Sequence, residues 1–304
     1  MRFRQHFLTS IVFFASAVSA SAYSSVYVVS AGITGNGVFG TINLASGAFE
    51  QIGPGEPDGY FGLASGPNGS LVSLTYAANL DSINPATGVP RRIGATGLGA
   101  CVIPSAACGP NSVFSLGGVN GKLFATDFQN NVYAVNASTG LATLLSDHSG
   151  IPASPFVLGS QNPDGTLNFG DEAIWGSGGK LYLTFDAFVF NPNTATVVKE
   201  VVAPKLYEID PGSGLAQVIG PTDLGIGGAT DVNGSSYALD DLTNQILSID
   251  LLTGGASVAG SFDTAAGVVN GVTATPEPST IAFAIAGAIA ICAMRRRRIL
   301  TARE

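Results

Sequence analysis

The chain has 304 residues, of which 46% are hydrophobic and 11% are charged, with 40 glycines and 16 prolines. This apolar share excludes an intrinsically disordered protein, and so many glycines favour a fold with many turns over a helical bundle. Residues 23–274 hold 19 acidic and 6 basic side chains. So negative a body excludes a nucleic-acid binder, which needs cationic surface to neutralise phosphate.

The N-terminus predicts a secretory signal peptide over residues 1–22. Two arginines precede the apolar run from Phe7 to Val18, and the small residues Ala20 and Ala22 follow it. A basic start, a short apolar stretch and small residues at the cleavage point form the pattern that signal peptidase reads. We therefore expect a signal helix, cleavage near Ala22, and export of the rest of the chain.

The body, residues 23–274, repeats one phrase five times. An alternating apolar strand ends in Asn or Asp, small residues and a glycine follow, and a second strand begins. The Asx side chain accepts hydrogen bonds from backbone N–H groups ahead of it, and the glycine adopts a positive φ where the chain reverses. Each phrase therefore predicts a β-hairpin. The five turn residues are Asn43, Asn84, Asn136, Asp210 and Asp250.

A second hairpin precedes four of these phrases, so that one unit has four antiparallel strands. The turn residues follow one another at intervals of 41, 52, 74 and 40 residues. Sheets repeating at this spacing predict an all-β fold, a β-propeller of five four-stranded blades. The first unit lacks its innermost strand, and we expect the last strand, Val268 to Ala274, to complete it. The 74-residue interval leaves a degenerate sixth blade as an alternative.

Insertions lengthen two of the units. Residues 98–111 contain Cys101 and Cys108, which we expect to form a disulfide after export; a metal or redox pair is disfavoured because no other soft ligand is near. Asp147 to Gly170 contains three prolines and has no periodicity, and Asp186 to Pro204 lengthens a hairpin of the same unit. Loops of this kind on a propeller face commonly carry binding.

The body offers few residues for catalysis. His148 is its one histidine, and no catalytic motif accompanies it. Carboxylates near the expected inner strands could hold Ca²⁺ or sugar hydroxyls if they converged on the central channel, but we favour solvated loop groups. We interpret Asp240 and Asp241 as turn formers. The carboxylate candidates are Asp58, Asp171, Glu172, Asp223 and Asp231. Aromatic residues that could stack on a sugar, but that we interpret as packing residues, are Trp175, Tyr60, Tyr76 and Tyr182.

The C-terminal tail, residues 275–304, has three parts. Its first part is the motif Pro276, Glu277 and Pro278, its second the uncharged stretch from Ile281 to Met294, and its third the cluster Arg295, Arg296, Arg297 and Arg298. The prolines keep the motif extended, the apolar stretch predicts a transmembrane helix, and the arginines hold the far end of that helix in the cytoplasm. This tail resembles the PEP-CTERM sorting signal of bacteria that make extracellular polysaccharide. An ordinary single-pass anchor is the alternative.

The resemblance implies that a membrane-embedded exosortase recognises Pro276, Glu277 and Pro278, cuts near them, and releases or re-attaches the protein outside the cell. It covers the tail alone and implies no activity for the body. We therefore expect an exported, non-catalytic β-propeller of the cell surface or matrix that needs no cofactor and is linked to exopolysaccharide. The alternative is a secreted carbohydrate- or lactone-type hydrolase with a channel carboxylate cluster, with or without a bound calcium ion.

Overall fold

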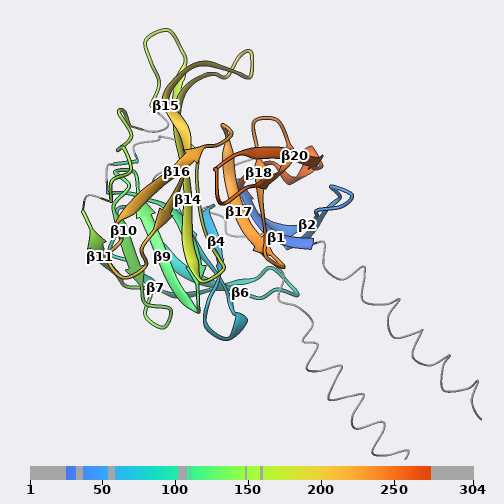
Figure 1. Ribbon diagram of the computed structural model, residues 1–304. Coiled ribbons are helices and arrows are strands. Elements are labelled where there is room, and N and C mark those ends of the chain that lie inside the picture. The colour runs from blue at the N-terminus through green and yellow to red at the C-terminus, as the bar shows by residue number, and fades with distance from the viewer. Residues whose placement is uncertain are drawn as a thin grey trace, which may run out of the picture. The chain divides into compact units, whose positions relative to one another are not determined.

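The structure is a computed structural model, and its described residues form five β-sheets (Figure 1). The expected terminal helices, the sorting motif, Asp58 and His148 lie outside the described residues and stay predictions. Within the described part of the chain, no helix is long and apolar enough to span a membrane. The described residues are 25–31, 37–53, 59–101, 108–109, 111–147, 149–157 and 160–274.

Each sheet is one propeller blade, and its strands run antiparallel from the axis outward. Blade 1 contains β21 (Val268–Ala274), β1 (Ser25–Ala31), β2 (Gly37–Asn43) and β3 (Phe49–Gly53). Blade 2 contains β4 (Tyr60–Ser65), β5 (Leu71–Thr75), β6 (Asn79–Ile83) and β7 (Pro90–Ala95). Blade 3 contains β8 (Val113–Val119), β9 (Lys122–Asp127), β10 (Val132–Val135) and β11 (Ala142–Ser146).

The last two blades follow the same plan. Blade 4 contains β13 (Glu172–Ser177), β14 (Lys180–Asn191), β15 (Thr196–Ile209) and β16 (Ala216–Pro221), with the short β12 (Leu167–Phe169) added on β14. Blade 5 contains β17 (Ile226–Val232), β18 (Ser235–Asp240), β19 (Gln245–Ile249) and β20 (Ala256–Ser261). Two single-turn 3₁₀ helices complete the described elements, η1 (Pro67–Gly69) and η2 (Thr264–Ala266).

The two ends of the body meet in blade 1, as the spare C-terminal strand predicted. β21 pairs with β1 in antiparallel register, with Val26 opposite Ala274 and Val28 opposite Val272. Figure 1 shows β1 and β2, in blue, next to orange strands from the end of the body. The ring is therefore closed by pairing between the first and the last strand of the body, which gives blade 1 four strands like its neighbours.

The Asx-to-glycine turns of the repeat are confirmed. Asn43 Oδ1 accepts hydrogen bonds from the backbone N–H groups of Ala45 and Ser46, at 2.9 and 3.0 Å, and Gly47 has a φ of 72°. The turns at Asn84, Asn136, Asp210 and Asp250 likewise bond ahead and end in a positive-φ glycine. This local chemistry sets the position of every outer hairpin.

The alternative of a sixth blade is wrong. Two features of blade 4 account for the 74-residue interval. The segment between β11 and β13 is long, and β14 and β15 continue their pairing to Asn191 and Thr196, well beyond the length of the other strands. Figure 1 shows this hairpin projecting from the body near the β15 label. The sequence expectation that Asp186 to Pro204 lengthens a hairpin is confirmed.

The core is divided among the seams between neighbouring blades. Phe39 and Tyr60 fill the seam between blades 1 and 2, and Phe124 and Tyr207 belong to the cluster between blades 3 and 4. Each blade is held to its neighbours by apolar burial, which is the main favourable contribution to folding. The inner strands β4, β8, β13, β17 and β21 surround the axis in this order.

Candidate functional site

A cavity of about 320 Å³ lies where the five inner strands end, and we call it the mouth. Every blade contributes to it, since its lining includes Ser65 of β4, Gly118 of β8, Ser177 of β13, Asp231 of β17 and Thr273 of β21. Inner strands of a propeller all run in one direction, so their last residues meet around the axis. The volume is within the range of about 300–1,000 Å³ that is typical of small-ligand sites.

Polar side chains of the mouth are held by hydrogen bonds to one another. Asp231 Oδ1 accepts from the Gly234 backbone N–H at 2.8 Å, and Oδ2 accepts from the Ser177 hydroxyl. The hydroxyls of Ser65 and Thr273 lie 3.0 Å apart. A carboxylate has about four lone-pair sites, so Asp231 keeps acceptor capacity for a ligand. The mouth therefore suits a ligand that donates hydrogen bonds, such as a polyhydroxylated sugar.

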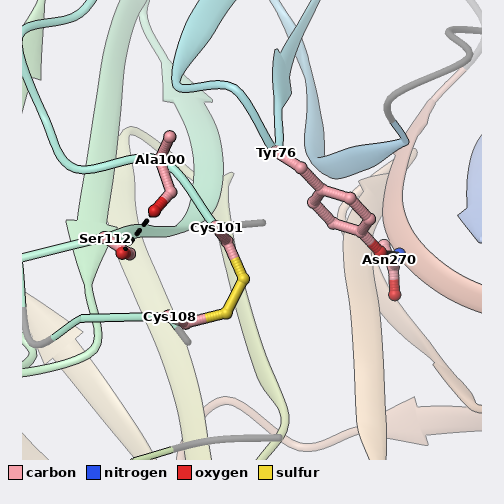
Figure 2. Close-up of a disulfide and its surroundings, with 6 residues drawn as sticks. All are labelled: Tyr76, Ala100, Cys101, Cys108, Ser112 and Asn270. Atoms are coloured by element: carbon pink, nitrogen blue, oxygen red, sulfur yellow. Dashed lines mark hydrogen bonds between the residues drawn. A yellow bond between two sulfur atoms is a disulfide. The ribbon is translucent and has the colours of Figure 1, made fainter. Parts of the chain in front are cut away.

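Aromatic residues and the disulfide occupy one half of the opposite end of the channel, where the inner strands begin. Phe61 packs on Tyr76, with ring centroids 4.2 Å apart, and Asn270 donates to the Tyr76 hydroxyl at 2.8 Å. The structure joins Cys101 to Cys108 (Figure 2). The Cys101 N–H donates to the Tyr76 carbonyl at 2.7 Å. Burial raises the pKa of Tyr76 to about 12, so it stays a hydroxyl donor.

Four aspartates occupy the other half of this end, and we call them the carboxyl cluster: Asp171, Asp186, Asp240 and Asp241. Asp186 is almost fully buried and accepts from the backbone N–H groups of Asp171 and Gly225, at 3.0 and 2.9 Å. Asp171 and Asp241 keep part of their surface exposed, but Asp171 Oδ2 and Asp241 Oδ1 are buried without a hydrogen-bond partner. An unpaired buried carboxylate oxygen is costly unless the group is protonated.

The electrostatics of the carboxyl cluster favour protonation. Burial, followed by the charges of Asp240 and Asp186, raises the pKa of Asp241 to about 8. Burial and the charges of Asp241 and Asp240 raise the pKa of Asp171 well above its usual range. The pKa of Asp186 is also raised, by burial first and by Asp171 second. The cluster therefore carries protons at neutral pH that free aspartates would have released.

We predict that the folded protein loses stability as the pH rises from 5.5 to 8.5. The unfolded chain releases these protons near pH 4, so the raised pKa values favour the folded state at low pH, and this contribution is lost as the pH passes about 8. The melting temperature should fall by about 5 °C or more across this range. Differential scanning calorimetry at several pH values measures it.

Asp241→Asn replaces the buried acid by a neutral group of the same shape, and its melting temperature should vary less with pH. Glu50→Gln, which changes an exposed carboxylate on β3, is the control and should keep the slope of the parent. Equal slopes for Asp241→Asn and the parent would contradict the role of the cluster.

The carboxylates named from the sequence do not come together as a set. Asp171 lies in the carboxyl cluster, Asp231 lies at the mouth at the other end of the channel, and Asp223 is exposed on the loop before β17. Glu172 is buried and accepts from the Thr126 hydroxyl, and burial raises its pKa well above the usual range. Within the described ranges, no group of three or more His, Cys, Asp or Glu side chains is placed to hold a metal ion.

Sequence reasoning missed the role of Asp240 and Asp241. Asp240 does form a turn, because its Oδ1 accepts from Leu242 and Thr243 N–H groups at 2.9 and 3.0 Å, but both residues also belong to the carboxyl cluster. The repeat itself contains a signal that the two aspartates differ from ordinary turn residues. When the blades are aligned on their inner hairpins, Asp241 and Asp186 occupy the position that Tyr76 and Phe128 occupy in blades 2 and 3.

The aromatic residues considered for sugar stacking are packing residues. Trp175 is 3% exposed and its indole N–H donates to Ser236 Oγ at 3.2 Å. Tyr60, Tyr76 and Tyr182 are equally buried. None of these four rings offers a free face for a ligand, so the interpretation as blade packing is confirmed.

No family model and no curated protein matches the chain. Among solved structures, it is similar to one from a nidogen/laminin complex, with 12% identity, a TM-score of 0.46, and coverage of 84% of this chain and 98% of that one. A protein of unknown function from Bacteroides thetaiotaomicron has 14% identity and a TM-score of 0.44, with coverage of 85% and 66%. At these values the similarity concerns the fold alone.

Proposed function

We propose that this chain is an exported β-propeller that binds an extracellular polysaccharide at its mouth and reaches its final place through its C-terminal tail. The mouth carries the proposal, because it gathers Ser65, Ser177, Asp231 and Thr273 from four blades around one cavity. Hydroxyl and carboxylate oxygens at such a site accept hydrogen bonds from sugar hydroxyls. The proposed role is binding without catalysis.

The number of carboxyl groups at the mouth supports sugar binding over sugar hydrolysis. Asp231 is the one carboxylate among the described residues that line it. Most glycoside hydrolases need a pair of carboxyl groups flanking the scissile bond, one as acid and one as base or nucleophile. The carboxyl cluster cannot supply the second group there, since it lies where the inner strands begin and the mouth lies where they end.

The place where the chain leaves the body supports processing of the tail. Ala274 is the last residue of β21 and is paired with Val26, so the ring is complete before residue 275. A cut near Pro276, Glu277 and Pro278 would leave every blade intact. We propose that an exosortase-type enzyme makes this cut after signal peptidase has removed residues 1–22. Mass spectrometry of the secreted protein tests it, and an intact tail would overturn it.

Binding at the mouth is tested by titration of the full chain with dextran, a neutral glucan. We expect Asp231→Asn to weaken binding about tenfold or more, because a hydrogen bond to a charged acceptor contributes about 1.5–3 kcal/mol. Asp250→Asn changes an exposed turn residue of blade 5 and serves as the control. Dextran binding that Asp231→Asn leaves unchanged would move the site away from the mouth.

A further inference from the structure

A second cavity, of about 440 Å³, lies at the rim between blades 2 and 3, and we call it the rim cleft. Its floor and walls come from the hairpin strands of blade 2 and from the outer turn of blade 3 at Ala137 and Ser138. It differs from the mouth in charge, because it is bordered by Arg91 and Arg92, which are two of only six basic residues in the body.

Strand register places the Arg91 side chain toward this cleft. Val72, Ser82 and Arg91 are paired side by side across β5, β6 and β7, so their side chains share one face of the sheet. Val72 belongs to the apolar cluster that joins blade 2 to blade 3. The row therefore faces blade 3, and the exposed Arg91 is its outermost member.

Arg92 is held beside the cleft by a buried acid. Its Nε lies 3.5 Å from Oδ1 of Asp81, and the Asp81 side chain is only 3% exposed whereas that of Arg92 is 54% exposed. Asp81 is paired with Arg92 across β6 and β7, on the sheet face opposite Arg91. Arg92 therefore borders the cleft at the edge of β7 with its charge paired to Asp81, and Arg91 is the arginine whose side chain faces the cleft.

Two serine hydroxyls add acceptors for hydrogen bonds. Ser82 Oγ donates to the Arg91 carbonyl at 3.1 Å, and Ser70 Oγ donates to the Pro67 carbonyl at 3.0 Å. Since each hydroxyl proton is already used, the free lone pairs of both oxygens can accept from a ligand. Val72 and Ile93 supply apolar lining between these polar groups.

We propose that the rim cleft binds a carboxylate-bearing sugar, a uronic acid unit of an acidic polysaccharide. Arginine recognises a carboxylate with two parallel hydrogen bonds, and the serine oxygens accept from sugar hydroxyls. Inorganic phosphate matches the guanidinium groups but brings few hydroxyl donors for the serines. The inference rests on the proposed function and specifies its ligand class at a second site.

The negative charge of the body does not oppose this assignment. At physiological ionic strength, charges separated by more than about 8 Å in water are largely screened. A sugar acid seated in the rim cleft therefore responds mainly to Arg91, because the charge of Arg92 is already paired with Asp81.

The test titrates the full chain with trigalacturonate and with maltotriose, a neutral sugar of the same length, by isothermal calorimetry. We expect Arg91→Gln to weaken trigalacturonate binding at least tenfold. Arg91→Lys should weaken it less, because lysine keeps the positive charge but cannot form the two parallel hydrogen bonds of a guanidinium group. Lys199→Gln, on the long hairpin of blade 4, removes one exposed positive charge far along the chain and should bind as the parent does. Equal melting temperatures of the variants show that folding is unchanged.

Each other outcome overturns a defined part of the inference. If folded Arg91→Gln binds trigalacturonate as tightly as the parent does, this sugar does not bind at the rim cleft. Binding of maltotriose in that case would still support the mouth proposal. Displacement of trigalacturonate by an equal concentration of inorganic phosphate would make the cleft a general anion site. Failure of both trisaccharides to bind would overturn the cleft, and the dextran titration decides the mouth proposal separately.

Discussion

A chain that ends at Ala274 is expected to melt at the temperature of the full protein, whereas a chain that ends at Gly267 is expected to lose its cooperative transition. The two truncations differ only by β21, which pairs with β1 along its length and is the innermost strand of blade 1. Val269 is 0% exposed and Val272 is 5% exposed, and both pack on Val26 and Val28. Loss of β21 therefore opens the ring between blades 5 and 2.

The expected cost of losing β21 exceeds that of an ordinary core substitution. Two buried valines contribute about 1.5–3 kcal/mol each, and each lost strand hydrogen bond adds about 1 kcal/mol. The sum is on the order of 5 kcal/mol or more, which is most of the stability of a typical domain. Both truncations should be exported before purification so that Cys101 and Cys108 oxidise. Thermal unfolding followed by circular dichroism measures the difference, and equal transitions would show that β21 is dispensable.

Much of this fold could be predicted because its repeat is encoded locally. Asn43 and Gly47 specify a turn within five residues, and the same chemistry recurs at Asp210 and Gly214. A count of such turns gives the number of blades. Because the first unit lacks its innermost strand, the spare strand Val268–Ala274 is predicted to complete it and to close the ring. None of these steps needs knowledge of which residues touch across the ring.

The sites were harder to predict because they depend on contacts between blades. Asp171 and Asp241 are 70 positions apart in the sequence, and they approach each other only when blades 4 and 5 pack together. The rim cleft likewise combines Arg91 with Ser138 of the next blade. Composition gave a further misleading impression, because an acidic body does not suggest a local basic site. Repeat alignment, which compares equivalent positions of different blades, recovers part of this information.

The inner ring explains why the chain needs glycine in its strands. Each inner strand has a glycine at which an added Cβ would lie less than 3.0 Å from the neighbouring inner strand. Five blades around one axis bring the inner strands so close that backbone meets backbone. These glycines are Gly62, Gly117, Gly176, Gly227 and Gly271.

Gly117→Ala is therefore expected to destabilise the protein strongly, although alanine is the smallest change available. Its Cβ would fall less than 3.0 Å from the carbonyl group of Ile174 on β13, and neither backbone can move without opening the seam between blades 3 and 4. Overpacking of this kind costs about 1–3 kcal/mol when side chains can adjust, and we expect at least the upper value here because backbone atoms are involved. Gly260→Ala is the matched control, since Gly260 also lies in a strand but its Cβ would meet nothing closer than 3.8 Å. Urea unfolding of both variants measures the free energies of unfolding, and a Gly117→Ala loss no larger than that of Gly260→Ala would mean that the inner ring is looser than its backbone contacts indicate.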